Sequence, residues 1–282
     1  MRNPLETGKD TDVRYLTALL AACVLVLSRP PQGGPYVVEA QSPVSVLAPT
    51  GTLRAVFLGS NPVHGRVDPK TGTATGPVPD LVAELARTLK VTSTAQPVPD
   101  AAGVIAALKN GTADIGFLAY DETRAREVDF GPAFIVMHNS YLVRADSPLQ
   151  KSADVDRAGV TVAAIKGQSQ QLFVSRTLKQ AMIRVLDTMP PQAELESMLI
   201  GKTVDAFAIN RQRGLDAQAA SSGKLRPLPD NFMDVEQCFV VEKGASAKLK
   251  AIEQFVTTVR QSGFMNASIE RAKLAGVSPA RK

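Results

Sequence analysis

The chain has 282 residues and a formal net charge of +5, with 44% hydrophobic and 21% charged residues. This composition is ordinary for a globular protein, and the length suits one large domain or two smaller ones. Basic residues are interleaved with acids rather than clustered, only 5% of residues are aromatic, and Trp is absent. These features argue against a nucleic-acid-binding surface.

Residues 1–40 have the features of a signal peptide with a linker. Basic residues precede the apolar run 16–27, which is short for a membrane span but matches the apolar region of a secretory signal. The Val-Glu-Ala sequence before Gln41 fits a cleavage site, so the mature chain is predicted to start near Gln41 with a flexible lead to Pro49. A lipoprotein signal ending at Cys23 and an uncleaved anchor are the alternatives.

The sequence offers few candidates for a disulfide or a metal site. One of its two cysteines is Cys23, and the other, Cys238, lies in an apolar run where it is predicted to be a small buried hydrophobic residue. An exported protein without a disulfide is stable when its core is large enough. His64 and His138 are far apart in sequence, so neither a metal nor a cofactor is expected.

From residue 51 onward, β-rich runs alternate with amphipathic runs. The predicted strands are 52–58, 91–98, 113–119, 159–165, 183–188, 204–209 and 236–244. The predicted helices are 81–89, 101–110, 168–178, 191–200 and 246–261, with Asp80 and Ser246 as N-caps of the first and last. Such alternation is typical of α/β units with parallel sheets, and two successive sets indicate two lobes.

Four segments together resemble a known family. They are GTLRAVFLGSNP (51–62), GPVPDLVAELARTL (76–89), the run from LKNGTADIGF to DETRAREVDFGPAF (108–134), and LIGKTVDAFAIN (199–210). Each motif alone is weakly specific. In this order, over about 51–276, they resemble the solute-binding proteins of polar amino-acid ABC importers, bacterial extracellular solute-binding protein family 3.

The resemblance implies a two-lobed periplasmic binding protein fold of type II. In that fold the second lobe is inserted in the first, and the ligand cleft lies at the hinge between them. The two crossings are predicted near His138 and Cys238. The first lobe is then 51–138 plus 239–276, and the second lobe is 139–238.

Arg124 is the main predicted site residue. The resemblance places it where the family receives the ligand carboxylate. A planar guanidinium binds a carboxylate through two parallel hydrogen bonds, and partial desolvation at a strand end strengthens the pair. Arg126 is predicted to lie on the surface, with Glu127 and Asp129 solvating the turn.

Four more residues are candidates for the cleft. Gln168 and Ser169 lie where a strand becomes a helix, so their backbone N–H groups and the Ser169 hydroxyl can meet an anion. A plain N-cap role for Ser169 is the alternative. Asn61 and His64 occupy the loop where the family has an acidic residue and an aromatic lid. His64 would stack on or hydrogen-bond to the ligand, with an exposed loop position as the alternative.

Three departures from the family bear on the ligand. Ala119 replaces a small polar residue, and Asp121 replaces a Thr. Asn210 stands where the family has the Asp that pairs with an α-ammonium. An amide cannot neutralise a buried cation, which is costly to leave unpaired. A carboxylate ligand without that ammonium therefore fits better, unless Asp121 supplies the anion.

The sequence thus predicts an exported solute-binding protein without catalytic activity. It would deliver a small carboxylate-bearing molecule, an amino acid or related organic acid, to an inner-membrane ABC permease. It is expected to be a periplasmic monomer, with a lipid anchor at Cys23 as an option.

Two other classes stay open. An enzyme similar to cyclohexadienyl dehydratase would need a general acid with a raised pKa in the cleft. Glu236 is the one candidate, with a surface position as its alternative. A ligand-sensing module would have to act through a separate partner.

Overall fold

A ten-stranded sheet runs through residues 42–280, the part of the chain that this computed structural model describes. Along the sheet the order is β4-β1-β5-β11-β6-β9-β7-β8, and β10 and β12 also pair with β6. Its strands are β1 (Thr52–Leu58), β4 (Thr92–Val98), β5 (Ile115–Ala119), β6 (Val128–Arg144), β7 (Thr161–Ile165), β8 (Met182–Leu186), β9 (Ala206–Asn210), β10 (Leu225–Pro227), β11 (Met233–Glu242) and β12 (Val277–Pro279). A separate antiparallel pair joins β2 (Arg66–Val67) to β3 (Ala74–Thr75).

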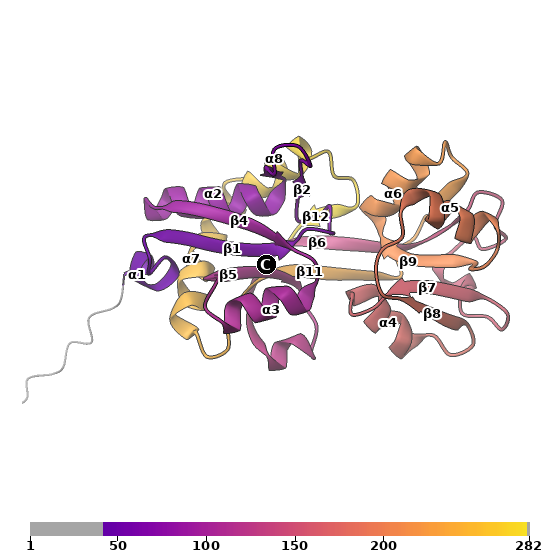
Figure 1. Ribbon diagram of the computed structural model, residues 1–282, viewed down its shortest axis with the longest axis horizontal. Coiled ribbons are helices and arrows are strands. Elements are labelled where there is room, and N and C mark those ends of the chain that lie inside the picture. Colours follow the sequence, from indigo (N-terminus) through magenta and orange to yellow (C-terminus); the bar gives the residue numbers. More distant parts are fainter. Residues whose placement is uncertain (1–41, 281–282) are drawn as a thin grey trace, which may run out of the picture. The chain divides into compact units, whose positions relative to one another are not determined.

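Helices connect and cover these strands (Figure 1). They are α1 (Pro43–Leu47), α2 (Pro77–Leu89), α3 (Ala101–Lys109), α4 (Ser169–Thr177), α5 (Gln192–Ile200), α6 (Arg211–Ala220), α7 (Ser246–Gln261) and α8 (Phe264–Arg271). Strand β1 pairs in parallel with β4 and β5, and β7 pairs in parallel with β8 and β9. The predicted strands and helices are all present, and the α/β class is confirmed.

The apolar core divides into two lobes. In the first lobe, β1 and β5 are covered by α2, α3 and α7, and the rings of Phe117, Phe134 and Phe239 form an edge-packed cluster. In the second lobe, β7 and β9 are covered by α4, α5 and α6. Val162 packs on one face of β7 and Ala163 on the other, so helices bury the strand on both faces.

Two long strands join the lobes. Strands β6 and β11 lie side by side (Figure 1), paired from Val128 with Glu242 to Asn139 with Met233. At Asn139 the partner of β6 changes, because Asn139 also pairs with Asn210 at the end of β9. The same strand therefore pairs with β11 up to Asn139 and with β9 from Asn139 onward.

The flexible lead predicted from Gln41 to Pro49 is wrong for the residues described. Pro43–Leu47 form helix α1, whose N-cap is Ser42. The side chains of Leu47 and Ala48 are buried in the first-lobe core, and α1 contacts α7. Burial of this apolar surface orders the segment. The folded unit therefore begins before residue 51.

Two predicted helix starts also need correction. Helix α2 begins at Pro77 after Gly76, because Pro suits the first helical position. Asp80 consequently lies in the first turn, where it accepts hydrogen bonds from Ser268 and Arg271. Helix α7 has Ala245 as its N-cap, and Ser246 is its first residue.

The predictions for the signal region, including the cleavage at Gln41 and the lipid anchor at Cys23, fall outside the described residues. Within residues 42–280, no helix has the length and apolar character needed to cross a membrane.

Candidate functional site

A cavity of about 710 Å³ lies at the carboxyl ends of the parallel strands of both lobes. Its wall includes residues after β1, β5, β7, β8 and β9, the first residues of α3 and α4, and side chains from β6 and β11. In open α/β sheets this edge is where ligands bind, because loops and helix N-termini converge there. The position agrees with the cleft that the sequence predicts.

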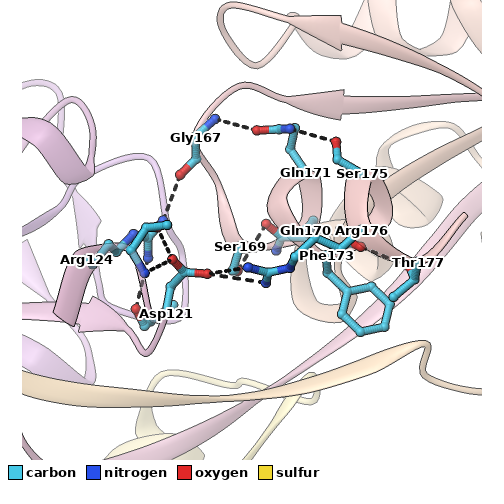
Figure 2. A network of polar contacts seen from close by, with 12 residues as sticks. Asp121, Arg124, Gly167, Ser169, Gln170, Gln171, Phe173, Ser175, Arg176 and Thr177 are labelled. Atoms are coloured by element: carbon cyan, nitrogen blue, oxygen red, sulfur yellow. Dashed lines mark hydrogen bonds and ion pairs between the residues drawn. The ribbon is translucent and has the colours of Figure 1, made fainter. Parts of the chain in front are cut away.

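Arg124 lines this cavity from a single 3₁₀ turn (Arg124–Arg126) that follows β5. It is only 6% exposed. Its guanidinium donates to the carbonyl oxygens of Ala119 at 2.9 Å and Gly167 at 2.7 Å (Figure 2). Burial lowers the pKa of Arg124, and the nearby charge of Asp121 partly offsets this. Arg126, by contrast, is exposed, as predicted.

Asp121 is not in the cavity wall but forms a contact between the lobes. Its carboxylate accepts from the backbone N–H of Thr123 at 2.9 Å and from the Thr123 hydroxyl. It also pairs with Arg176 of α4 at 3.3 Å (Figure 2). Burial would raise the pKa of this carboxyl, but the Thr123 hydrogen bonds and the charges of Arg124 and Arg176 lower it below its usual value. The carboxylate of Asp121 therefore already has hydrogen-bond and ion-pair partners within the protein.

His64 lies behind the cavity wall and is fully buried. Its Nε2 is 2.7 Å from Oε1 of Gln237, a residue that does line the cavity. Since an amide oxygen only accepts, Nε2 carries a ring proton. The Nδ1 atom of His64 and the Nε2 atom of Gln237 have no hydrogen-bond partner among residues 42–280. The exposed loop position considered for His64 is thus wrong.

The buried ring of His64 gives the stability of the protein a defined pH dependence. Burial lowers its pKa from 6.5 to about 4, against the Gln237 hydrogen bond, and Arg124 lowers it further. Between these values the unfolded chain binds a proton that the folded chain does not, so stability is lost as the pH falls. The expected loss is about 3 kcal/mol of unfolding free energy.

Urea denaturation at a series of pH values measures this loss. His64→Gln should flatten the dependence over that pH range, whatever its effect on stability at neutral pH. His138→Asn removes the other histidine and is the matched control, which should keep the dependence. A wild-type curve that is flat across the range would contradict the buried neutral ring.

The N-terminus of α4 supplies backbone donors to the cavity. Its N-cap is Gln168, without a side-chain cap, and Ser169 is the first helical residue rather than the N-cap. Ser169 and Gln170 are 7% and 3% exposed, and both line the cavity. The first N–H groups of a helix have no intrahelical partner, so they can donate to an anion.

Asn210 and Asn61 meet at the cavity from opposite lobes, with Nδ2 of Asn210 3.5 Å from Oδ1 of Asn61. Asn210 is 6% exposed, and its Oδ1 caps α6 by accepting from the Arg213 N–H at 2.8 Å. The guanidinium of Arg213 donates to the carbonyl oxygen of Ser60 and lines the cavity. Burial lowers the pKa of Arg213. The negative charge of Asp216 acts in the opposite direction, and the positive charge of Arg66 adds to the lowering.

The structure brings most of the predicted site residues together. The cavity wall contains Asn61, Ala119, Arg124, Gln168, Ser169 and Asn210, and it leaves out His64 and Asp121. Sequence reasoning missed Arg213 and Gln237. Arg213 follows Asn210 by one helical turn, which could have indicated it once α6 was recognised.

Comparisons with known proteins establish the family. The family model of the bacterial extracellular solute-binding proteins, family 3, matches residues 53–272. Its span is most of the chain, and the protein belongs to this family. A comparison with curated protein sequences finds no match.

Solved structures of similar proteins have the same fold. A putative binding component of an ABC transporter from Wolinella succinogenes, complexed with lysine, has a TM-score of 0.69 and 22% identity, covering 79% of this chain and 95% of that chain. An ancestral amino acid-binding protein, a precursor of cyclohexadienyl dehydratase, has a TM-score of 0.67 and 21% identity, covering 82% and 99%. A histidine kinase sensor domain has a TM-score of 0.66 and 20% identity, covering 81% and 98%.

Proposed function

We propose that this solute-binding protein holds a small carboxylate-bearing molecule in the cavity and delivers it to an ABC permease of the inner membrane. The observation that carries the proposal is Arg124. Its guanidinium is almost fully buried in the cavity wall and, among residues 42–280, hydrogen-bonds to carbonyl oxygens without a direct ion pair, so it can receive a ligand anion. A desolvated guanidinium binds a carboxylate strongly because little water competes.

The proposed lobe boundaries follow the packing of the long strands. We place the first crossing at Asn139, where β6 changes partner, close to the predicted His138. We place the second crossing near Phe232 rather than Cys238. The ring of Phe232 stacks on Tyr141 in the second lobe, whereas Val235 onward packs in the first-lobe core.

The two alternative functions have less support. Glu236, the candidate general acid of an enzyme, is exposed and lies outside the cavity wall. The carboxyls that do line the cavity, Asp100 and Asp187, belong to exposed residues and are not enclosed in the cleft. A sensory role would use the same ligand cavity, and a histidine kinase sensor domain is among the structures with a similar fold. Identification of the partner protein would distinguish a sensory role from a role in transport.

A thermal-shift screen tests the proposed function. A ligand that binds only the folded state raises the apparent melting temperature. The purified protein is screened against a library of amino acids and organic acids, with Arg124→Ala as the reference for specific binding. Hits confined to compounds with a carboxylate, and lost in the variant, are expected. A library without any carboxylate hit would contradict the proposal.

Cleavage of a signal peptide during export would give the mature protein a defined N-terminus. The apolar run 16–27 and the small-residue site before Gln41 favour cleavage there, which would leave α1 intact because it begins at Pro43. Mass spectrometry of the exported protein is expected to show an N-terminus near Gln41. A diacylglyceryl mass on Cys23 would instead identify a lipoprotein held at the membrane surface.

A further inference from the structure

A second guanidinium faces the cavity from the opposite lobe. Arg124 comes from the first lobe, and Arg213 comes from the first turn of α6 in the second lobe. The acidic residues near them form ion pairs with other side chains: Asp121 pairs with Arg176, and Asp216 pairs with Arg66. Within residues 42–280, neither Arg124 nor Arg213 forms an ion pair. Two largely desolvated guanidinium groups therefore have no carboxylate in direct contact, although Asp121 and Asp216 lie close enough to raise their pKa values against the effect of burial.

Three helix N-termini add to this positive character. The first two residues of α3 and of α4 belong to the cavity wall, as do the N-cap of α6, Asn210, and its third residue, Arg213. The N-terminus of a helix carries a partial positive charge and free N–H groups. An anion in the cavity would thus be favoured by backbone dipoles from both lobes as well as by the guanidinium groups.

The negative side chains of the wall do not balance these charges. Asp100 accepts from the Gly103 N–H at 2.8 Å and so caps α3. Asp187 pairs with Lys166 at 3.4 Å, and its side chain is 86% exposed. Exposed charges are screened by water, whereas buried ones act at a lower effective dielectric. The buried part of the cavity is therefore cationic, with no buried carboxylate to receive an ammonium group.

Gln237 adds an amide donor without a partner at the buried end of the cavity wall. It is 0% exposed and lines the cavity, and its Oε1 is held by the ring of His64. Its Nε2 has no partner among the described residues. A buried amide N–H without a partner is costly, so a ligand that offers an acceptor there gains affinity. Carboxylate and carbonyl oxygens are such acceptors.

From these observations we infer that the ligand is a dianion, a dicarboxylate or a molecule with two equivalent acid groups. One acid group binds Arg124, the N-terminus of α4 and Gln237, and the other binds Arg213. This inference rests on the proposed function and narrows its ligand class. Because the two guanidinium groups belong to different lobes, a dianion bridges the lobes and favours the closed cleft, while a monocarboxylate satisfies only one of them.

Calorimetric titration with paired acids tests the inference. The probes are succinate, glutarate, adipate, pimelate and suberate, each paired with the monocarboxylate of the same chain length, together with L-glutamine and L-lysine. At least one dicarboxylate is expected to bind roughly 30-fold more tightly than its monocarboxylate partner. Arg213→Gln should remove most of that preference, read as the ratio of dicarboxylate to monocarboxylate affinity within the same variant. Arg213→Lys, which keeps the charge without the planar fork, should be intermediate.

The control is Arg184→Gln, which removes a positive charge from an exposed position on β8 outside the cavity wall. It should keep the full preference, and circular dichroism should show that every variant is folded. Monocarboxylates or the two amino acids binding as tightly as the dicarboxylates would overturn the dianion and leave the proposed function standing. A panel in which no acid binds would overturn the dianion, and a thermal-shift library without any carboxylate hit would overturn the proposed function as well.

Discussion

Replacing Arg124 with alanine is expected to weaken the binding of a carboxylate ligand by about 30-fold to several thousand-fold, or about 2–5 kcal/mol. The reason is the burial of Arg124, which is 6% exposed and whose guanidinium, among residues 42–280, hydrogen-bonds to carbonyl oxygens alone. Its loss would remove the main positive charge at the first-lobe side of the cavity. Calorimetric titration with the best hit of the thermal-shift screen gives the affinity directly.

Arg126, two residues after Arg124, offers a matched control for this variant. Arg126 lies on the same 3₁₀ turn but is exposed, so Arg126→Ala removes an equal charge without touching the cavity. It should bind within about threefold of the wild type, since exposed charges contribute little. The variant Arg124→Ala should keep its secondary structure by circular dichroism. Equal affinities of the wild type and Arg124→Ala would remove the basis of the site.

The fold could be predicted because its strands are buried on both faces. In β7, Val162 and Ala164 pack on one side while Ala163 and Ile165 pack on the other, which produces a continuous apolar run. Such a run followed by an amphipathic helix is the pattern of a parallel βαβ unit. The same pattern placed the strand ends and the strand-to-helix junction at Gln168, whereas Arg124 and Asn210 were identified as site residues through the family resemblance.

Helix α6 could not be predicted, because it lacks the apolar stripe on which the prediction depends. Among its residues only Gln212, Gly214 and Ala217 are buried, and they form no hydrophobic face. The helix is instead fixed by its Asn210 cap and by contacts with β6, β9 and β10. Missing the helix also meant missing Arg213 on its first turn.

The surroundings of His64 were equally hidden from the sequence. A polar ring in a loop next to Gly65 is more often exposed, and only tertiary packing decides otherwise. Here Gln237, more than 170 positions away, supplies the hydrogen bond that makes burial tolerable. A partner at such a separation leaves no local pattern. The same holds for Asp121, whose partner Arg176 belongs to the other lobe.

The replacement Asn210→Asp is expected to change which class of ligand the cavity prefers. Asn210 is buried in the wall, where a carboxylate would be close to the ligand and to Arg213. Asp is as good an N-cap as Asn, so the cap of α6 and the fold should be kept. The new anion would attract an α-ammonium and repel an acid group of the ligand.

Binding of carboxylates without an ammonium is expected to weaken by about tenfold, and binding of α-amino acids to strengthen by about tenfold, which is about 1.4 kcal/mol in each direction. Titration of both proteins with glutarate and L-glutamate separates the two effects, because these probes differ by the ammonium group alone. Asn266→Asp, which adds the same charge at an exposed position on α8, should leave both affinities unchanged. Tight binding of ordinary α-amino acids by the wild type would mean that Asn210 does not exclude an ammonium. The exposed Asp100 would then be the carboxylate of the wall left to receive it, because Asp121 already pairs with Arg176 and Asp187 with Lys166.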